Sequence, residues 1–95
     1  MRFAWDDAKD AANRRRHGFP LAAGIAVVED PLVVDWIDRR CLYDEERIFG
    51  LGIYRSTVLM AVYTFRPPDI CRLISVRKAT PNEAKRYYLD RTRAW

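Results

Sequence analysis

The last strand-like segment of the chain carries three basic side chains, at Arg72, Arg77 and Lys78. A guanidinium donates hydrogen bonds in a planar fork that matches phosphate oxygens, so Arg77 is the first candidate for stabilising charge on a reacting phosphate. Alternation along a strand places Arg72 and Lys78 on the face opposite Arg77, unless the strand twists or ends there. A salt bridge from Arg77 to Glu83 or Glu46 inside the fold is the competing interpretation.

Two further residues could exchange protons with a substrate. His17 is the sole histidine, and histidine is the side chain best suited to proton transfer near neutral pH. At the end of a predicted helix, however, a histidine more commonly bonds the last carbonyls. Glu83 could act as a general base, but it stands where a capping box places a glutamate. Metal-free cleavage of a phosphodiester needs a base, cations and a proton donor, and its candidate catalytic residues are Arg77, His17, Arg72 and Glu83.

Side chains of the two flanking helices could hold the rest of a nucleic acid. Lys9 and Asn13 share a helical face with His17, where they could bind a phosphate or simply face water. Tyr87 and Tyr88 could stack on bases, although helical spacing puts at least one of them in the core. The candidate RNA-binding residues are Lys9, Asn13, Arg16, Lys78 and Tyr87. Trp5 is expected in the core.

Capping signals predict two helices in the first third of the chain. Asp6 can accept hydrogen bonds from the first free N–H groups, and Gly18 can take the left-handed conformation that ends a helix. These signals predict a helix over Asp7–His17. Pro20 can start a second short helix that runs to about Glu29, and Asp30-Pro31 should stop it.

The middle of the chain is β-rich, and its end is helical. Short polar or proline-rich breaks separate the β-rich segments, which favours antiparallel hairpins. The predicted strands are Leu32–Ile37, Arg47–Ile53, Thr57–Phe65 and Ile70–Arg77. Thr80-Pro81-Asn82-Glu83 then combines a capping box with a proline at the first helical position, which predicts a helix toward Arg93. The expected fold class is α+β, with two N-terminal helices, a four-stranded antiparallel sheet and a C-terminal helix, the helices covering one face of the sheet.

Length and composition indicate one globular domain over residues 1–95. The chain is 49% hydrophobic and 32% charged, which is too apolar for a disordered protein and too charged for a membrane protein. Its longest apolar runs, Leu21–Val28 and Val58–Phe65, fall short of the roughly 20 residues of a membrane helix. No apolar signal core follows Met1, so we expect a cytoplasmic protein without contact to membranes.

Neither the cysteines nor the net charge assigns a function alone. Cys41 and Cys71 lack the closely spaced companions of a zinc site, so we expect two reduced thiols, no metal and no cofactor. The net charge is +4, and its excess lies in residues 66–95, where eight basic side chains face three acidic ones. Such a field could attract RNA or an acidic protein, or merely keep the surface solvated.

Several ordered motifs resemble the BrnT family. The string Phe3-Ala4-Trp5-Asp6, then Lys9 and Asn13, then Arg16-His17-Gly18, is similar to the opening signature of that family. The later matches occur in the same order and extend the likeness over nearly the whole chain: Asp30-Pro31, Glu45-Glu46-Arg47, Thr64, Arg72–Ala79, Glu83 and Tyr87. One turn departs from the pattern, because Phe65-Arg66-Pro67-Pro68 stands where a polar residue and a glycine are expected. If this turn contacts RNA, its different residues change the substrate preference.

The resemblance implies a RelE-like fold and a toxin of a type II toxin-antitoxin system that cleaves cellular RNA. It also implies neutralisation by a BrnA-type antitoxin, whose dimeric DNA-binding part lets the complex repress its own promoter, so that DNA is reached only through the antitoxin. Two other functions remain open: a RelE-like toxin that inhibits a protein such as gyrase, and a non-catalytic nucleic-acid-binding domain. The cleavage mechanism requires that Arg77, His17 and their neighbours converge on one concave spot that holds a single phosphate.

Overall fold

One five-stranded sheet carries all the helices of the fold. The computed structural model describes residues 1–38 and 46–93, so Cys41 and Glu45 lie outside the described residues. The strands are β1 (Arg2–Ala4), β2 (Val34–Ile37), β3 (Ile48–Tyr54), β4 (Thr57–Arg66) and β5 (Ile70–Lys78). The helices are α1 (Asp7–His17), the short 3₁₀ turn η1 (Leu21–Ala23), α2 (Gly24–Glu29) and α3 (Pro81–Arg93). The α+β class predicted from the sequence is confirmed.

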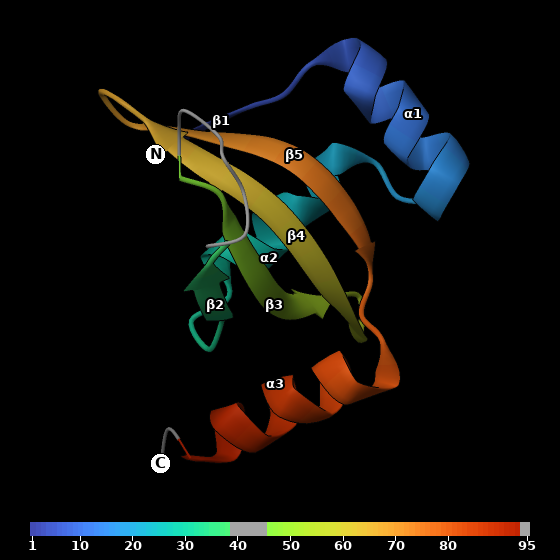
Figure 1. Cartoon of the computed structure of the whole chain (residues 1–95), viewed down its shortest axis with the longest axis vertical. Helices are drawn as coiled ribbons and strands as arrows, with labels where there is room; N and C mark the ends of the chain where they lie inside the picture. The colour runs from blue at the N-terminus through green and yellow to red at the C-terminus, as the bar shows by residue number, and fades with distance from the viewer. Residues whose placement is uncertain (39–45, 94–95) are drawn as a thin grey trace.

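The sheet is mixed, because its first strand was not predicted. The strand order is β1-β5-β4-β3-β2, and the last four strands pair antiparallel as expected. β1 pairs parallel to β5, with Phe3 opposite Cys71 (Figure 1). A segment of three residues is too short to show strand alternation in a sequence. The prediction of a purely antiparallel four-stranded sheet is therefore wrong by this one strand.

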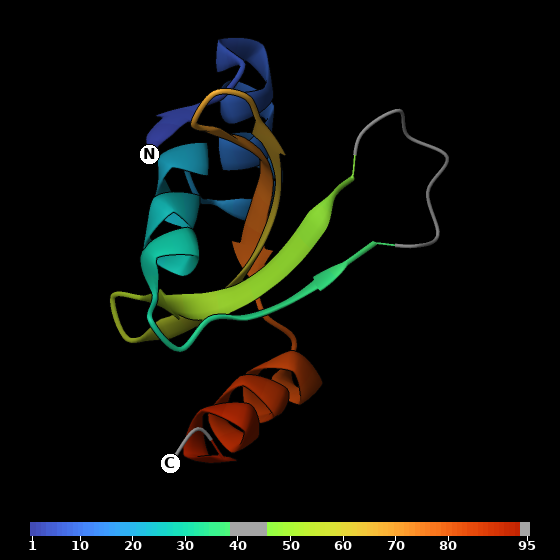
Figure 2. The ribbon, with the colours of Figure 1, turned by 90° about the vertical axis from the view of Figure 1, so that its left-hand side faces the viewer.

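The helices lie on both faces of the sheet, and not on one as predicted. A first core cluster packs η1 and α2 against β4 and β5 through buried side chains such as Leu21, Val27 and Leu59. A second cluster lies on the other face, where Tyr87 of α3 packs with Met60. Figure 2 shows α1 and α2 beside the sheet and α3 below it. The fold thus has two apolar layers, and each sheet face can present its own side chains.

A β-bulge changes the alternation of β5. Val62 pairs with Ser75 and Tyr63 pairs with Leu73, so Ile74 is the extra residue. An extra residue shifts all later side chains to the opposite face. Leu73 and Val76 accordingly both point into the first cluster.

Because of the bulge, one of the three basic residues of β5 does not lie on the face predicted for it. Arg77 pairs with Met60 of the second cluster, and Lys78 pairs with Leu59 of the first. Arg72 precedes the bulge and therefore shares the face of Arg77, contrary to the simple alternation. The prediction that Lys78 points away from Arg77 is confirmed.

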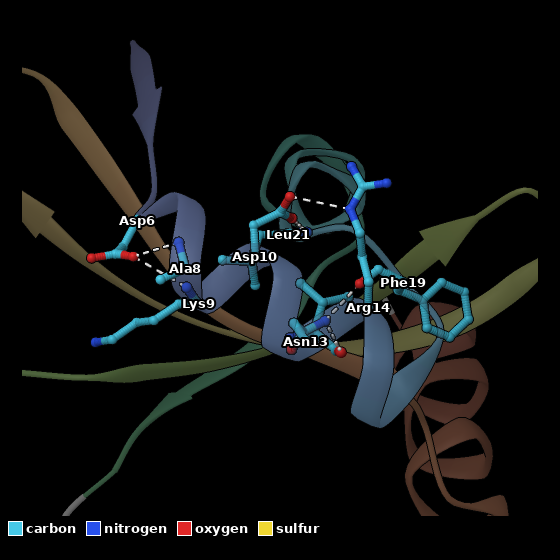
Figure 3. A network of polar contacts seen from close by, with 9 residues as sticks. Asp6, Ala8, Lys9, Asp10, Asn13, Arg14, Phe19 and Leu21 are labelled. Atoms are coloured by element: carbon cyan, nitrogen blue, oxygen red, sulfur yellow. Dashed lines mark hydrogen bonds and ion pairs between the residues drawn. The ribbon is translucent and has the colours of Figure 1, made fainter.

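The caps predicted at both ends of α1 and at the start of α3 are confirmed. The Asp6 carboxylate accepts hydrogen bonds from the backbone N–H groups of Ala8 and Lys9 at 2.8 and 3.1 Å (Figure 3), and Gly18 ends α1 with φ of 80°. These hydrogen bonds, that of Lys9 N–H first, hold the pKa of Asp6 below its usual value. The capping box of α3 also forms, since Thr80 N–H donates to Glu83 at 2.8 Å and Glu83 N–H donates to Thr80 at 3.2 Å.

The buried thiol, possible metal ligands and the apolarity of the helices were each predicted from the sequence. Cys71 is fully buried, and burial raises the pKa of its thiol to about 11. In residues 1–38 and 46–93, no group of three or more His, Cys, Asp or Glu side chains is placed to hold a metal ion. Within the same ranges, none of the helices combines the length and apolarity required to cross a membrane.

Candidate functional sites on the two faces of the sheet

Arg77 and Glu83 form a bidentate ion pair where β5 gives way to α3. The two guanidinium NH₂ groups of Arg77 lie 2.8 and 2.9 Å from the carboxylate oxygens of Glu83, one of the two partners expected from the sequence. The side chains remain 35% and 23% exposed. Their hydrogen bonds raise the pKa of Arg77 and lower that of Glu83. Both groups are therefore charged at neutral pH and reachable from solvent.

The ion pair lines a cleft of about 410 Å³, called here the open-face cleft. Its other walls are Trp36, Ile37, Asp38, Phe49 and Met60. The rings of Trp36 and Phe49 meet edge to face at 5.8 Å, and the Arg86 guanidinium lies 4.5 Å from the Trp36 ring centroid. The sequence predicted the strands that carry these rings, but not their register, so it missed both aromatic residues. Sites that bind single-stranded nucleic acids commonly combine cationic groups with aromatic rings.

Arg72 and Lys78 stand apart from this cleft. Arg72 shares the face of Arg77, but five residues of strand separate them by roughly 15 Å at the usual rise per residue. Its charge acts instead on the α1 N-terminus, where it contributes to the lowered pKa of Asp6. Lys78 is exposed on the other face, and only its carbonyl meets Arg77, by accepting a hydrogen bond at 3.2 Å.

A second cleft, called here the α1 cleft, lies between α1 and β5. Its volume is about 570 Å³, and its lining residues are Lys9, Ala12, Asn13, Arg15, Arg16, His17, Ile74 and Ser75. Three of the predicted RNA-binding residues and the sole histidine thus do come together. Sequence analysis did not single out Arg15 or Ser75. The basic run Arg14-Arg15-Arg16 was the available signal for the first of them.

Two of the predicted RNA-binding residues are occupied inside the fold. The Asn13 amide donates to the carbonyls of Phe19 and Val76 at 2.8 Å and accepts from Val76 N–H at 3.1 Å (Figure 3). Tyr87 is 1% exposed, and its hydroxyl donates to Asp30 at 2.6 Å. Because both side chains are hydrogen-bonded within the fold, neither is among the proposed RNA contacts.

Most of the chain matches one known protein family. Residues 5–83 match the family model described as the ribonuclease toxin, BrnT, of type II toxin-antitoxin systems. The chain belongs to this family. It is therefore a ribonuclease toxin whose substrate is RNA and whose partner is an antitoxin. A comparison with curated proteins finds no matching sequence.

A solved structure with the same fold supports the BrnT assignment. The crystal structure of the Brucella abortus ribonuclease toxin BrnT, at 1.1 Å resolution, superposes with a TM-score of 0.62. The match covers 84% of this chain and 97% of that one, at 17% identity. At that identity the likeness speaks for the fold, while the placement of the active residues has to come from this BrnT-family chain itself.

The structure places His17 and Arg77 in different clefts. His17 lines the α1 cleft, whereas Arg77 and Glu83 line the open-face cleft, and the two linings share no residue. The α1 helix packs against β5, while α3 packs against β2, β3 and β4. The structure does not bring His17 and Arg77 to one cleft, and their convergence on one phosphate stays a prediction. The catalytic roles of Arg77, Glu83 and Arg72 stay predictions.

Proposed function

We propose that this BrnT-family toxin cleaves single-stranded RNA at the open-face cleft, without a metal, and that Arg77 holds the scissile phosphate. The observation that carries the proposal is the partly exposed Arg77–Glu83 pair beside the rings of Trp36 and Phe49. A cation, an ionised carboxylate and stacking surfaces lie in one cleft, which are the groups needed to bind and attack a phosphodiester. His17 has no part in this mechanism, because it lines the α1 cleft and not the open-face cleft.

Arg77 can bind a phosphate without leaving Glu83. A guanidinium has five N–H donors, and the bonds to Glu83 and to the Lys78 carbonyl use three of them. The remaining donors can reach phosphate oxygens and stabilise the negative charge that builds up in the transition state. Any shift of Arg77 toward the phosphate also weakens its hold on Glu83, which is the main cause of the lowered pKa. Substrate binding therefore makes Glu83 a better base.

The proposed reaction is an internal transesterification. Glu83 takes the proton from the ribose 2′-OH, and the 2′ oxygen attacks phosphorus. The bond from phosphorus to the 5′ oxygen breaks, that oxygen takes a proton from water, and the resulting hydroxide takes the proton held by Glu83, which restores the carboxylate. The products are a 2′,3′-cyclic phosphate and a free 5′-OH. Bases next to the reacting phosphate stack on Trp36 and Phe49, which requires unpaired RNA.

The test is cleavage of a defined RNA oligonucleotide in the presence of a chelator. Arg77→Gln is expected to lower the rate by about 10²- to 10³-fold, since it removes a charge-stabilising donor. The control is Arg55→Gln, an exposed arginine of the turn between β3 and β4, which should cleave like the wild type. Urea unfolding of each variant checks the fold. Wild-type rates in folded Arg77→Gln, or loss of all cleavage with the chelator, would refute the proposal.

The family also requires an antitoxin, and we propose that it is of the BrnA type. In this proposal the chain acts in the cytoplasm, where its RNA substrate lies, and meets DNA only through the antitoxin complex. Expression of the chain alone should arrest growth, and co-expression of a BrnA-type protein should restore it. Growth arrest that Arg77→Gln does not relieve would instead favour inhibition of a protein target, without RNA cleavage.

A further inference from the structure

The α1 cleft collects cations for which the cleavage mechanism has no use. Lys9, Arg15 and Arg16 line it together with His17, and the Ser75 hydroxyl adds a polar group to the opposite wall. The lining contains no acidic side chain. Lys9, Arg15 and Arg16 are all exposed, and within residues 1–38 and 46–93 they form no ion pair. The lining of the cleft therefore carries a net positive charge.

Two carboxylates at the start of α1, Asp6 and Asp10, form hydrogen bonds outside the cleft. Asp6 caps the helix through Ala8 and Lys9 N–H. Asp10 accepts from Leu21 N–H at 2.7 Å and from Arg14 at 3.1 Å (Figure 3). Neither Asp6 nor Asp10 lines the cleft, so an anion that enters it meets cations without a competing carboxylate.

The walls of the α1 cleft are held in place before any ligand arrives. Asn13, at the base of the cleft, fastens α1 to Val76 of β5 through two hydrogen bonds. On the strand side, the bulge lets the consecutive residues Ile74 and Ser75 both line the cleft. A preformed site binds with a smaller entropy cost than one that must order on binding.

Helix stability does not explain the basic residues of the cleft. Cations in the last turn, such as Arg15, Arg16 and His17, do favour the negative end of the helix dipole. Lys9, however, stands in the first turn of α1, where a positive charge opposes the dipole. The helix dipole therefore does not account for Lys9, whose charge interacts with the Asp6 carboxylate.

We propose that the α1 cleft is a second RNA-binding site, which holds backbone phosphates of the substrate away from the phosphate that is cleaved. The identity of the ligand as RNA rests on the proposed function. The cleft suits a phosphate backbone better than a protein segment, because Ala12 and Ile74 are its only apolar lining residues, whereas protein interfaces have apolar centres. Arginine and lysine side chains along one groove are the usual contacts to a single-stranded backbone.

The experiment measures binding separately from cleavage. A fluorescent 2′-O-methyl RNA oligonucleotide has no free 2′-OH and cannot be cut, so its anisotropy reports affinity alone. Lys9→Gln/Arg16→Gln in the full chain is compared with Arg55→Gln/Lys85→Gln, which removes the same two charges from exposed positions outside both clefts. The first variant should bind at least tenfold more weakly. The slope of log affinity against log salt should be shallower by about 1.4 in this variant, since each of the two lost phosphate contacts to a single strand contributes roughly 0.7.

Each other outcome overturns the second site. If the two double variants lose affinity equally, only net charge matters. If the wild type does not bind the oligonucleotide, the cleft holds no RNA, whatever Arg77 does in cleavage. If Lys9→Gln/Arg16→Gln keeps its RNA affinity but loses binding to a polyglutamate peptide, the cleft receives an acidic protein. With cleavable RNA, the same variant should raise KM and leave kcat at saturation unchanged, whereas Arg77→Gln lowers kcat.

Discussion

At the scale of single residues, one ion pair has two tasks. The Glu83 carboxylate closes the capping box of α3 and pairs with Arg77, so it stabilises the fold. The same carboxylate is the proposed base. This double use explains why the competing interpretations of Arg77 and Glu83 from the sequence, structural and catalytic, do not exclude each other.

The structural task of Glu83 predicts a pH-dependent stability. Hydrogen bonding to Arg77 lowers the pKa of Glu83 in the folded chain, so its contribution is complete above the ordinary carboxyl pKa of about 4.3 and is lost as the pH falls through the lower folded value. Glu83→Gln keeps a side chain that can cap but removes the charge. We expect its free energy of unfolding to fall by about 1 kcal/mol at pH 7 and its difference from the wild type to shrink as the pH falls below about 4.3.

Urea unfolding at several pH values between 7 and 3 measures this difference. Glu29→Gln, an exposed carboxylate at the end of α2, is the control and should follow the wild type at every pH. A gap between Glu83→Gln and the wild type that stays constant down to pH 3 would show that the charge of Glu83 does not stabilise the fold.

At the scale of elements, α1 closes an edge of the sheet. β1 covers β5 only at Ile70–Arg72, so the later part of β5 has no described strand on its outer side, away from β4. An open edge exposes unpaired backbone groups. The Asn13 side chain takes the place of a strand there, because its amide both donates to and accepts from the backbone of Val76.

Asn13→Ala is therefore predicted to destabilise the fold. It leaves the N–H and carbonyl of Val76 without partners at a site where Asn13 itself is only 7% exposed. The expected loss is about 2–4 kcal/mol in the free energy of unfolding, measured by urea denaturation. Asn82→Ala, an exposed position of α3, is the matched control and should change little. A stable Asn13→Ala variant with weakened RNA affinity would instead return Asn13 to the RNA-binding residues.

The elements also show how far a sequence can predict this fold. Helix ends were predicted because their signals are local: Asp6 and Gly18 need only their own neighbours in the chain. β1 and the bulge at Ile74 depend on pairing between distant segments, and neither leaves a periodic pattern in the sequence. The error at the candidate site follows from this, since strand alternation without the bulge puts Arg72 on the wrong face.

At the scale of the whole molecule, the two clefts separate two tasks. α3 brings Glu83 to Arg77 at the open-face cleft, and α1 brings Lys9 and Arg16 to β5 at the α1 cleft. A substrate strand that fills both clefts has to be long enough to extend from one to the other. Such a strand is cut at one place while its backbone is held at another, so a short RNA that fills only the open-face cleft loses the second contact.

Because the two clefts have separate linings, we predict that the free-energy effects of substitutions in the two clefts are additive. Lys9→Gln/Arg16→Gln removes backbone contacts, and Arg77→Lys keeps the charge at the proposed active site but loses the planar fork, which should leave a measurable rate. The residues share no hydrogen-bond partner. Their effects on kcat/KM for a long fluorogenic RNA should therefore combine in the triple variant with a coupling below about 0.5 kcal/mol. A coupling well above that value would mean that both sets of residues act on the same phosphate, and the two-site arrangement would have to be abandoned.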